Sequence, residues 1–129
     1  MVCLDTDIII DFLRNKEYAI EKIKKFQEKG ALLLTTSVNT FELFKGAFKS
    51  SKKEDFDIIE RFISDLGILN FDLDSSIKCA EIFNELKRSG EIIDPIDLMI
   101  ASIVLTKKES LLTNNIKHFK RIPNLILEK

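Results

Sequence analysis

The sequence predicts an α/β fold, a three-layer α/β/α domain built around a central, mostly parallel sheet of four to five strands. Short apolar runs typical of buried strands alternate with stretches of helical periodicity, and this alternation indicates a parallel sheet. At 129 residues the chain has the length of one domain, which we expect to span residues 1–129. Hydrophobic residues make up 45% and charged residues 32%, which excludes intrinsic disorder.

The expected strands are five short apolar runs. They lie at residues 2–4, 32–35, 68–71, 111–113 and 125–127. Between them, Gly30 and Gly90 stand where a left-handed residue ends a helix. Ser51, followed by Glu54 three residues later, has the form of a capping box that opens another helix. Short linkers and right-handed crossovers then bring the carboxyl ends of the strands to one side of the sheet.

Asp5 directly follows the first strand, at the edge where open α/β sheets place their active sites. An alternative explanation is that Asp5 or Thr6 caps the helix that follows, because a side-chain oxygen there accepts from a free backbone N–H. Two carboxylates further along the chain shift the balance toward a site.

Glu42 is the second acid, on a helix after the second strand. The apolar stripe predicted for this helix consists of Val38, Phe41, Phe44 and Phe48. Glu42 falls at the margin of that stripe, where a carboxylate is half desolvated. It could instead be a surface glutamate that reaches toward Lys45 or Lys49.

Asp97 is the third acid, in the first turn of a helix that is apolar almost all round. Asp94 is expected to cap this helix, with Pro95 at the first helical position. Asp97 also suits the helix dipole, but its surroundings are too apolar for a freely solvated acid. Asn115 follows the strand at 111–113 and is a candidate either for the same site or for a turn.

These side chains point to a metal. Asp5, Glu42 and Asp97 would repel one another at close range unless a cation neutralised them. Oxygen ligands suit Mg²⁺, or alternatively Mn²⁺, and such ions act on phosphates. His118 is the only histidine, which argues against an imidazole base or a zinc site with several His ligands.

Charge and targeting signals indicate the setting of this chemistry. The net charge is −1, but lysines gather in clusters that include Lys45, Lys49 and Lys117. Such clusters are either solvated helix faces or surfaces for a nucleic-acid backbone. We expect no membrane span and no secretory signal, hence a cytoplasmic protein in which Cys3 and Cys79 are reduced.

Several motifs in this order resemble a PIN-domain ribonuclease of the VapC toxin type. They are Leu4-Asp5-Thr6-Asp7-Ile8, Glu42 after Thr40-Phe41, Asp94-Pro95-Ile96-Asp97-Leu98-Met99-Ile100-Ala101-Ser102, and Thr113-Asn114-Asn115-Ile116-Lys117-His118-Phe119. The resemblance covers nearly the whole chain. It implies that Asp5, Glu42 and Asp97 hold the metal, while Thr6 helps to hold Asp5. Asn115 would take a fourth polar position, where many members of the family have Asp, so a second tightly bound metal is less expected.

The function predicted from these motifs is a Mg²⁺-dependent endoribonuclease toxin that cuts single-stranded or loop RNA with an activated water. Lys45, Lys49 and Lys117 would then hold the RNA backbone. The resemblance further implies a 5′-phosphate product, a cognate VapB-like antitoxin that blocks the site, and a homodimer formed through apolar helices.

Two rival hypotheses remain open at the level of sequence. An inactive PIN-like scaffold would bind protein or RNA without cutting it, and Asn115 in place of an acid favours that alternative. Asp5-Thr6-Asp7 also resembles the start of haloacid-dehalogenase-type phosphatases, in which the first Asp is a nucleophile. The chain lacks the glycine expected after the second Asp and has no room for the usual cap.

Overall fold

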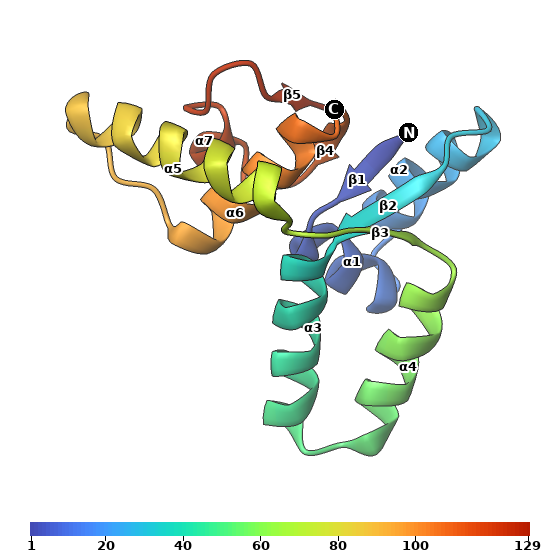
Figure 1. Cartoon of the computed structure of the whole chain (residues 1–129). Coiled ribbons are helices and arrows are strands. Elements are labelled where there is room, and N and C mark those ends of the chain that lie inside the picture. Colours follow the sequence, from blue (N-terminus) through green and yellow to red (C-terminus); the bar gives the residue numbers. More distant parts are fainter.

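The computed structural model describes residues 1–129, and its five strands form one sheet in which every neighbouring pair is parallel. The strands are β1 (Val2–Leu4), β2 (Leu33–Thr36), β3 (Gly67–Leu69), β4 (Ser110–Leu112) and β5 (Ile126–Leu127). Across the sheet they follow the order β3-β2-β1-β4-β5 (Figure 1). The predicted strands are confirmed, with small shifts at their ends.

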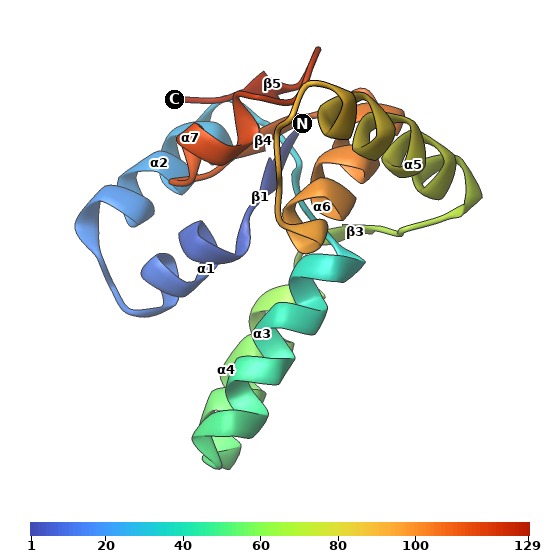
Figure 2. The ribbon, with the colours of Figure 1, turned by 90° about the vertical axis from the view of Figure 1, so that its left-hand side faces the viewer.

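Helices cover both faces of this sheet. They are α1 (Thr6–Leu13), α2 (Glu17–Glu28), α3 (Ser37–Ser50), α4 (Lys53–Ser64), α5 (Leu73–Arg88), α6 (Pro95–Thr106) and α7 (Ile116–Phe119). Successive side chains of β1 point to opposite faces. Val2 and Leu4 join the core beneath α1 and α2, whereas Cys3 joins the core beneath α5 and α6. The α3–α4 hairpin extends beyond the sheet (Figure 2). The three-layer prediction is therefore confirmed.

The strand order places a topological switch point beside β1. From β1 the chain crosses to β2 and β3 on one side, and then returns to β4 on the other side of β1. Leu4 pairs with Leu112, and the Asp5 N–H donates to the Leu112 carbonyl at 3.0 Å. Asp5 and Thr113 therefore leave the sheet side by side, at the edge where such folds bind ligands.

The helix ends confirm two predictions and correct one. Gly30 and Gly90 have φ values of 73° and 74° and end their helices as expected. The capping box predicted at Ser51 is wrong, because Ser51 is the left-handed residue (φ 61°) that ends α3. Helix α4 begins one residue after Lys52, which makes no side-chain cap.

The apolar stripe predicted for α3 is confirmed at Val38 but is wrong at Phe41 and Phe48. Its buried face is formed by Val38, Leu43 and Ala47, while Phe41 and Phe48 are 55% and 71% exposed. The sheet at the base of α3 and the α4 helix alongside it require only the narrower face, so the two phenylalanines are left in solvent. As for membrane association, none of the helices combines the length and apolarity that a membrane crossing requires.

Candidate active site

Asp5 is the most buried acid of the chain, with 6% of its surface exposed at the carboxyl end of β1. Its Oδ1 accepts from the Thr6 N–H and from Asn39 Nδ2, each at 2.9 Å. Its Oδ2 accepts from Thr113 Oγ1 at 2.6 Å. Burial raises the pKa of Asp5, and these donors oppose the rise. Asp5 thus caps α1, and it also lies at the centre of a polar cluster.

Glu42 reaches this cluster through Thr6 rather than turning to the lysines of its own helix. Thr6 Oγ1 donates to Glu42 Oε1 at 2.7 Å, and Asn39 Nδ2 donates to Thr6 Oγ1 at 2.9 Å. Asn39 is itself fixed, because its Oδ1 accepts from Thr36 Oγ1 at 2.6 Å. Since Asn39 is fully buried and also donates to Asp5, it links the first acid to the second.

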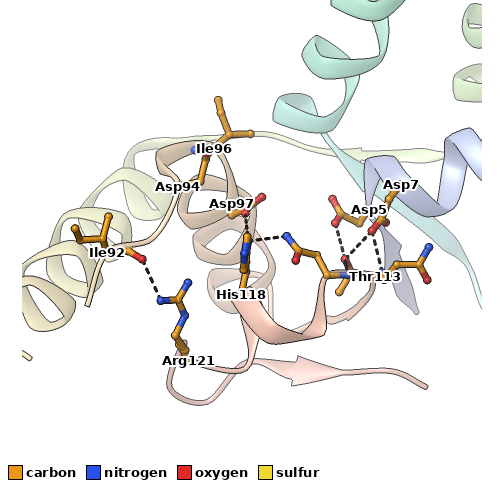
Figure 3. A network of polar contacts seen from close by, with 11 residues as sticks. Asp5, Asp7, Ile92, Asp94, Ile96, Asp97, Thr113, His118 and Arg121 are labelled. Atoms are coloured by element: carbon orange, nitrogen blue, oxygen red, sulfur yellow. Dashed lines mark hydrogen bonds and ion pairs between the residues drawn. The ribbon is translucent and has the colours of Figure 1, made fainter. Parts of the chain in front are cut away.

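Asp97 faces the cluster from the first turn of α6. Its Oδ2 lies 3.4 Å from His118 Nδ1, which in turn lies 2.9 Å from Asn115 Nδ2 (Figure 3). Burial raises the pKa of Asp97, the His118 contact lowers it, and the negative charge of Asp5 raises it further. The capping role of Asp94 is confirmed, because its Oδ1 accepts from the Ile96 N–H at 2.8 Å.

Asp7, in the first turn of α1, joins this helix to the β4–α7 turn. Its Oδ1 accepts from the Ile8 N–H at 2.7 Å, and its Oδ2 accepts from the Asn114 N–H at 2.9 Å and from Thr113 Oγ1 at 3.4 Å (Figure 3). Burial, reinforced by the charge of Asp5, raises the pKa of Asp7 to about 6. Asp7 therefore holds the turn that carries Thr113 and Asn115 against the start of α1.

The charge pattern of this edge calls for a cation. None of the four acids, Asp5, Asp7, Glu42 and Asp97, forms an ion pair with a lysine or arginine, since the ion pairs of the chain lie elsewhere or involve His118. Carboxylates without a positive partner at a half-buried site are costly, as the raised pKa values of three of them show.

The donor set fits one kind of metal site and excludes another. No three acidic, histidine or cysteine side chains are gathered into a ready-made metal cage. Instead, Thr113 and Asn39 hold Asp5, Thr6 holds Glu42, and His118 contacts Asp97. A hydrated Mg²⁺ needs only one or two carboxylates, because water and substrate phosphate supply its other ligands. The all-oxygen set therefore suits a largely hydrated Mg²⁺ or Mn²⁺.

Comparison with known proteins agrees with this geometry. The sequence matches the model of the PIN domain family over residues 2–125. The chain belongs to the PIN domain family. Ribonuclease VapC2 of Rickettsia felis is 36% identical over 97% of this chain and 94% of its own length. The tRNA(fMet)-specific endonuclease VapC of Salmonella typhimurium is 33% identical over the same shares, 97% and 94%.

Solved structures place this PIN domain in the same group. The VapBC2 structure from Rickettsia felis, bound to a DNA fragment from its promoter, aligns with a TM-score of 0.90 and 35% identity over 99% of this chain and 98% of that one. The DNA-bound VapBC structure from Salmonella typhimurium aligns with a TM-score of 0.89 and 32% identity over 98% and 96%. The predicted resemblance is confirmed: this is a PIN domain of the VapC type, related to nucleases.

Sequence reasoning missed four residues of this PIN-domain site: Asn39, Asp7, Thr113 and His118. Asn39 had a signal in the sequence, since it lies one helical turn before Glu42. Thr113 and Asp7 meet only through the register of β1 against β4, across 106 positions of sequence. No pattern within either segment indicates that contact.

The three lysines predicted to bind RNA are exposed and free of ion pairs. Lys45 and Lys49 lie on α3, and the Lys45 ammonium stands 5.5 Å from the centre of the Phe41 ring. Lys117 lies on α7, one residue before the His118 that contacts Asp97. Their role in RNA binding remains a prediction.

Proposed function

We propose that this PIN domain is a Mg²⁺-dependent endoribonuclease toxin, in which Asp5, Glu42 and Asp97 hold a hydrated metal ion, one or two of them directly and the rest through its bound waters. The observation that carries this proposal is the set of carboxylates, free of lysine and arginine partners, at the switch point beside β1. When bound there, Mg²⁺ supplies a water of lowered pKa and positive charge for the phosphate oxygens. Mn²⁺ would serve the same purpose.

The residues of the chain have distinct tasks in this proposal. Asn39 and Thr113 fix the two oxygens of Asp5, so that its carboxylate does not rotate when substrate arrives. Thr6 fixes Glu42 in the same way. His118 holds Asp97, and Asn115 holds His118, which places Asn115 behind the acids as an auxiliary residue. Such second contacts orient metal ligands and tune their basicity.

The proposed substrate is single-stranded or loop RNA. Exposed Lys45, Lys49 and Lys117 supply positive charge on two sides of the acids, and an unpaired strand can bring its backbone to a shallow, open edge. Two relatives, at 33% and 32% identity, are named tRNA(fMet)-specific endonucleases, which supports a loop within a structured RNA. The proposed product carries a 5′-phosphate.

The proposed protein partner is a VapB-like antitoxin. An open groove of about 320 Å³ between α1, α3 and α4 is lined by apolar side chains such as Ile10, Leu13 and Ile59, and it ends at Glu42. An amphipathic helix of the antitoxin fits such a groove and would cover the acid at its end. Ile58→Glu, at the exposed rim, should abolish antitoxin inhibition but leave RNA cleavage unchanged, whereas Phe83→Glu, at an exposed position of α5, should leave both unchanged.

We also propose a homodimer. Leu73 and Ile77 lie one helical turn apart on α5 and are 74% and 57% exposed, and Phe41 is 55% exposed at the start of α3. The Phe71 N–H donates to Ser37 Oγ at 3.2 Å, which brings the start of α5 close to the start of α3. A monomer at micromolar concentration in analytical ultracentrifugation would rule this dimer out.

The test of the proposed function is the sequencing of RNA ends after controlled expression of the wild-type chain and of Asp97→Asn. Defined new 5′ ends should appear with the wild type and be absent with the variant. Identical RNA ends in both cultures would favour the inactive scaffold.

A further inference from the structure

A basic groove runs along α2, between this helix and the C-terminal residues of the chain. Its cavity measures about 580 Å³, between α2 and the residues that follow β5. We call it the α2 groove, and its basic lining consists of Lys22, Lys25, Lys29 and Lys129. Two glutamates also line it, Glu21 and Glu128, so positive charge is in excess.

The lysines of the α2 groove are free to bind an anion. None of them forms an ion pair, and Glu128 is occupied because its Oε2 accepts from Ser110 Oγ at 3.0 Å. Lys22 and Lys29 stand over aromatic rings, with their ammonium groups 5.9 Å from the ring centres of Tyr18 and Phe26. The spacing of these residues places them along one face of α2.

Hydrogen bonds link one end of the α2 groove to the candidate active site. Tyr18 begins its lining, and the Tyr18 hydroxyl donates to Asp11 and accepts from Asn114 Nδ2. The Asn114 N–H donates to Asp7 at 2.9 Å, and the neighbouring Thr113 donates to Asp5 at 2.6 Å. Hydrogen bonds thus connect the Tyr18 end of the groove to the turn whose Thr113 binds Asp5. In Figure 2, α2, α7 and the C-terminal end lie on the same flank of the molecule.

We propose that the α2 groove holds the backbone of the RNA strand where it continues beyond the cleaved phosphate. This inference rests on the proposed ribonuclease function. From Tyr18 to Lys29 the helix rises about 16 Å, at about 1.5 Å per residue, so the tract can follow several consecutive nucleotides. Lysine binds phosphate as a mobile point charge and does not identify bases, so the groove adds affinity for long RNA independently of sequence.

The test compares two triple variants of the full chain. Lys22→Ala, Lys25→Ala and Lys29→Ala together remove three of the four lysines that line the groove. The matched control combines Lys24→Ala, Lys87→Ala and Arg88→Ala. The control removes the same charge from exposed positions, one of them on α2 itself, that do not line the groove. Because alanine has the highest helix propensity, both variants should keep the helices intact.

The probes are two unstructured single-stranded RNAs, about 6 and about 24 nucleotides long, a range chosen around the site sizes of single-strand-binding grooves. Binding is measured by fluorescence anisotropy in EDTA at several salt concentrations. On single strands each lost phosphate contact lowers the salt slope by about 0.7, so the groove variant should lose a slope of about 2 on long RNA. At 0.15 M salt this corresponds to about 50-fold weaker binding, with little change on short RNA.

The possible results separate the inference from the function beneath it. If the wild type cleaves RNA and the groove variant binds long RNA with the affinity and slope of the control, the groove does not hold RNA and the inference is overturned alone. If the wild type neither cleaves nor binds either RNA in the presence of Mg²⁺, the proposed function fails and the inference fails with it. Selective loss of long-RNA binding by the groove variant supports the inference, while cleavage by the wild type supports the function beneath it.

Discussion

Asp7 should make the metal-free protein less stable as the pH rises. Its pKa is about 6 in the folded chain, against 3.8 for an ordinary aspartate. Between these values the folded state binds more protons than the unfolded state, so the free energy of unfolding falls with increasing pH. Stability linked to Asp7 is therefore fully present below pH 3.8 and is lost as the pH rises from there through 6.

The size of this effect follows from the shift in pKa. About two pKa units at about 1.4 kcal/mol each would give about 3 kcal/mol. Because the Asp7 carboxylate is only half-buried, solvent screens part of the penalty, and we expect a loss of about 1.5 kcal/mol. The ion pair between Asp72 and Lys107 should add little to this pH dependence. The pKa of Asp72 lies well below 3.8, so both partners stay charged throughout the range.

The measurement is urea unfolding in EDTA at pH values from about 3 to about 7.5, for the wild type and for Asp7→Asn. The asparagine keeps an oxygen that can accept from the Ile8 N–H but cannot ionise, so the difference in free energy between the two proteins should change by about 1.5 kcal/mol over this range. If Asp7→Asn also loses the hydrogen bond from the Asn114 N–H, the free energy of unfolding of this variant falls by the same amount at every pH, and its dependence on pH is unchanged. Parallel curves for the two proteins would refute the reasoning.

Three further predictions concern the acids and their surroundings. Asp94→Asn should retain most RNA cleavage, since Asn caps a helix about as well as Asp; a loss as deep as that of Asp97→Asn would show a direct role. Lys45→Ala with Lys49→Ala should weaken RNA binding and lower the slope of log affinity against log salt concentration by about 1.4. An unchanged slope would show that these lysines are solvated and do not contact RNA phosphates. Asn115→Asp should tighten Mn²⁺ binding in calorimetry by adding charge beside Asp97, whereas unchanged affinity would place Asn115 outside the site.

Most of the fold could be predicted because strands and helices leave patterns within short stretches of sequence. Apolar runs and helical periodicity identified the five strands, and Gly30 and Gly90 ended the helices where expected. Errors arose where two local signals competed. Ser51 lies between two helices and was assigned to the start of the second, although its left-handed conformation ends the first. The helical spacing of Phe41 and Phe48 predicts that they share the apolar stripe of α3, yet both are exposed.

The candidate site was predictable only in part. Asp5, Glu42 and Asp97 stand at the ends or starts of elements, and that position is visible in a sequence. Their supports are not, because the contact between Thr113 and Asp5 depends on how β4 lies against β1, 108 positions apart. The sequence indicates no contact between His118 and Asp97, because their distance is fixed by the packing of α7 against α6.

Cleavage of one defined single-stranded RNA tests most directly whether Asp5 and Asp97 hold a metal that cuts RNA. The wild type and Asp94→Asn should cleave in Mg²⁺ and stop when EDTA is added. Asp5→Asn and Asp97→Asn should not cleave in either condition, while their circular dichroism remains that of the wild type. Cleavage by both of these variants at the wild-type rate, or cleavage by the wild type that persists in EDTA, would contradict the account.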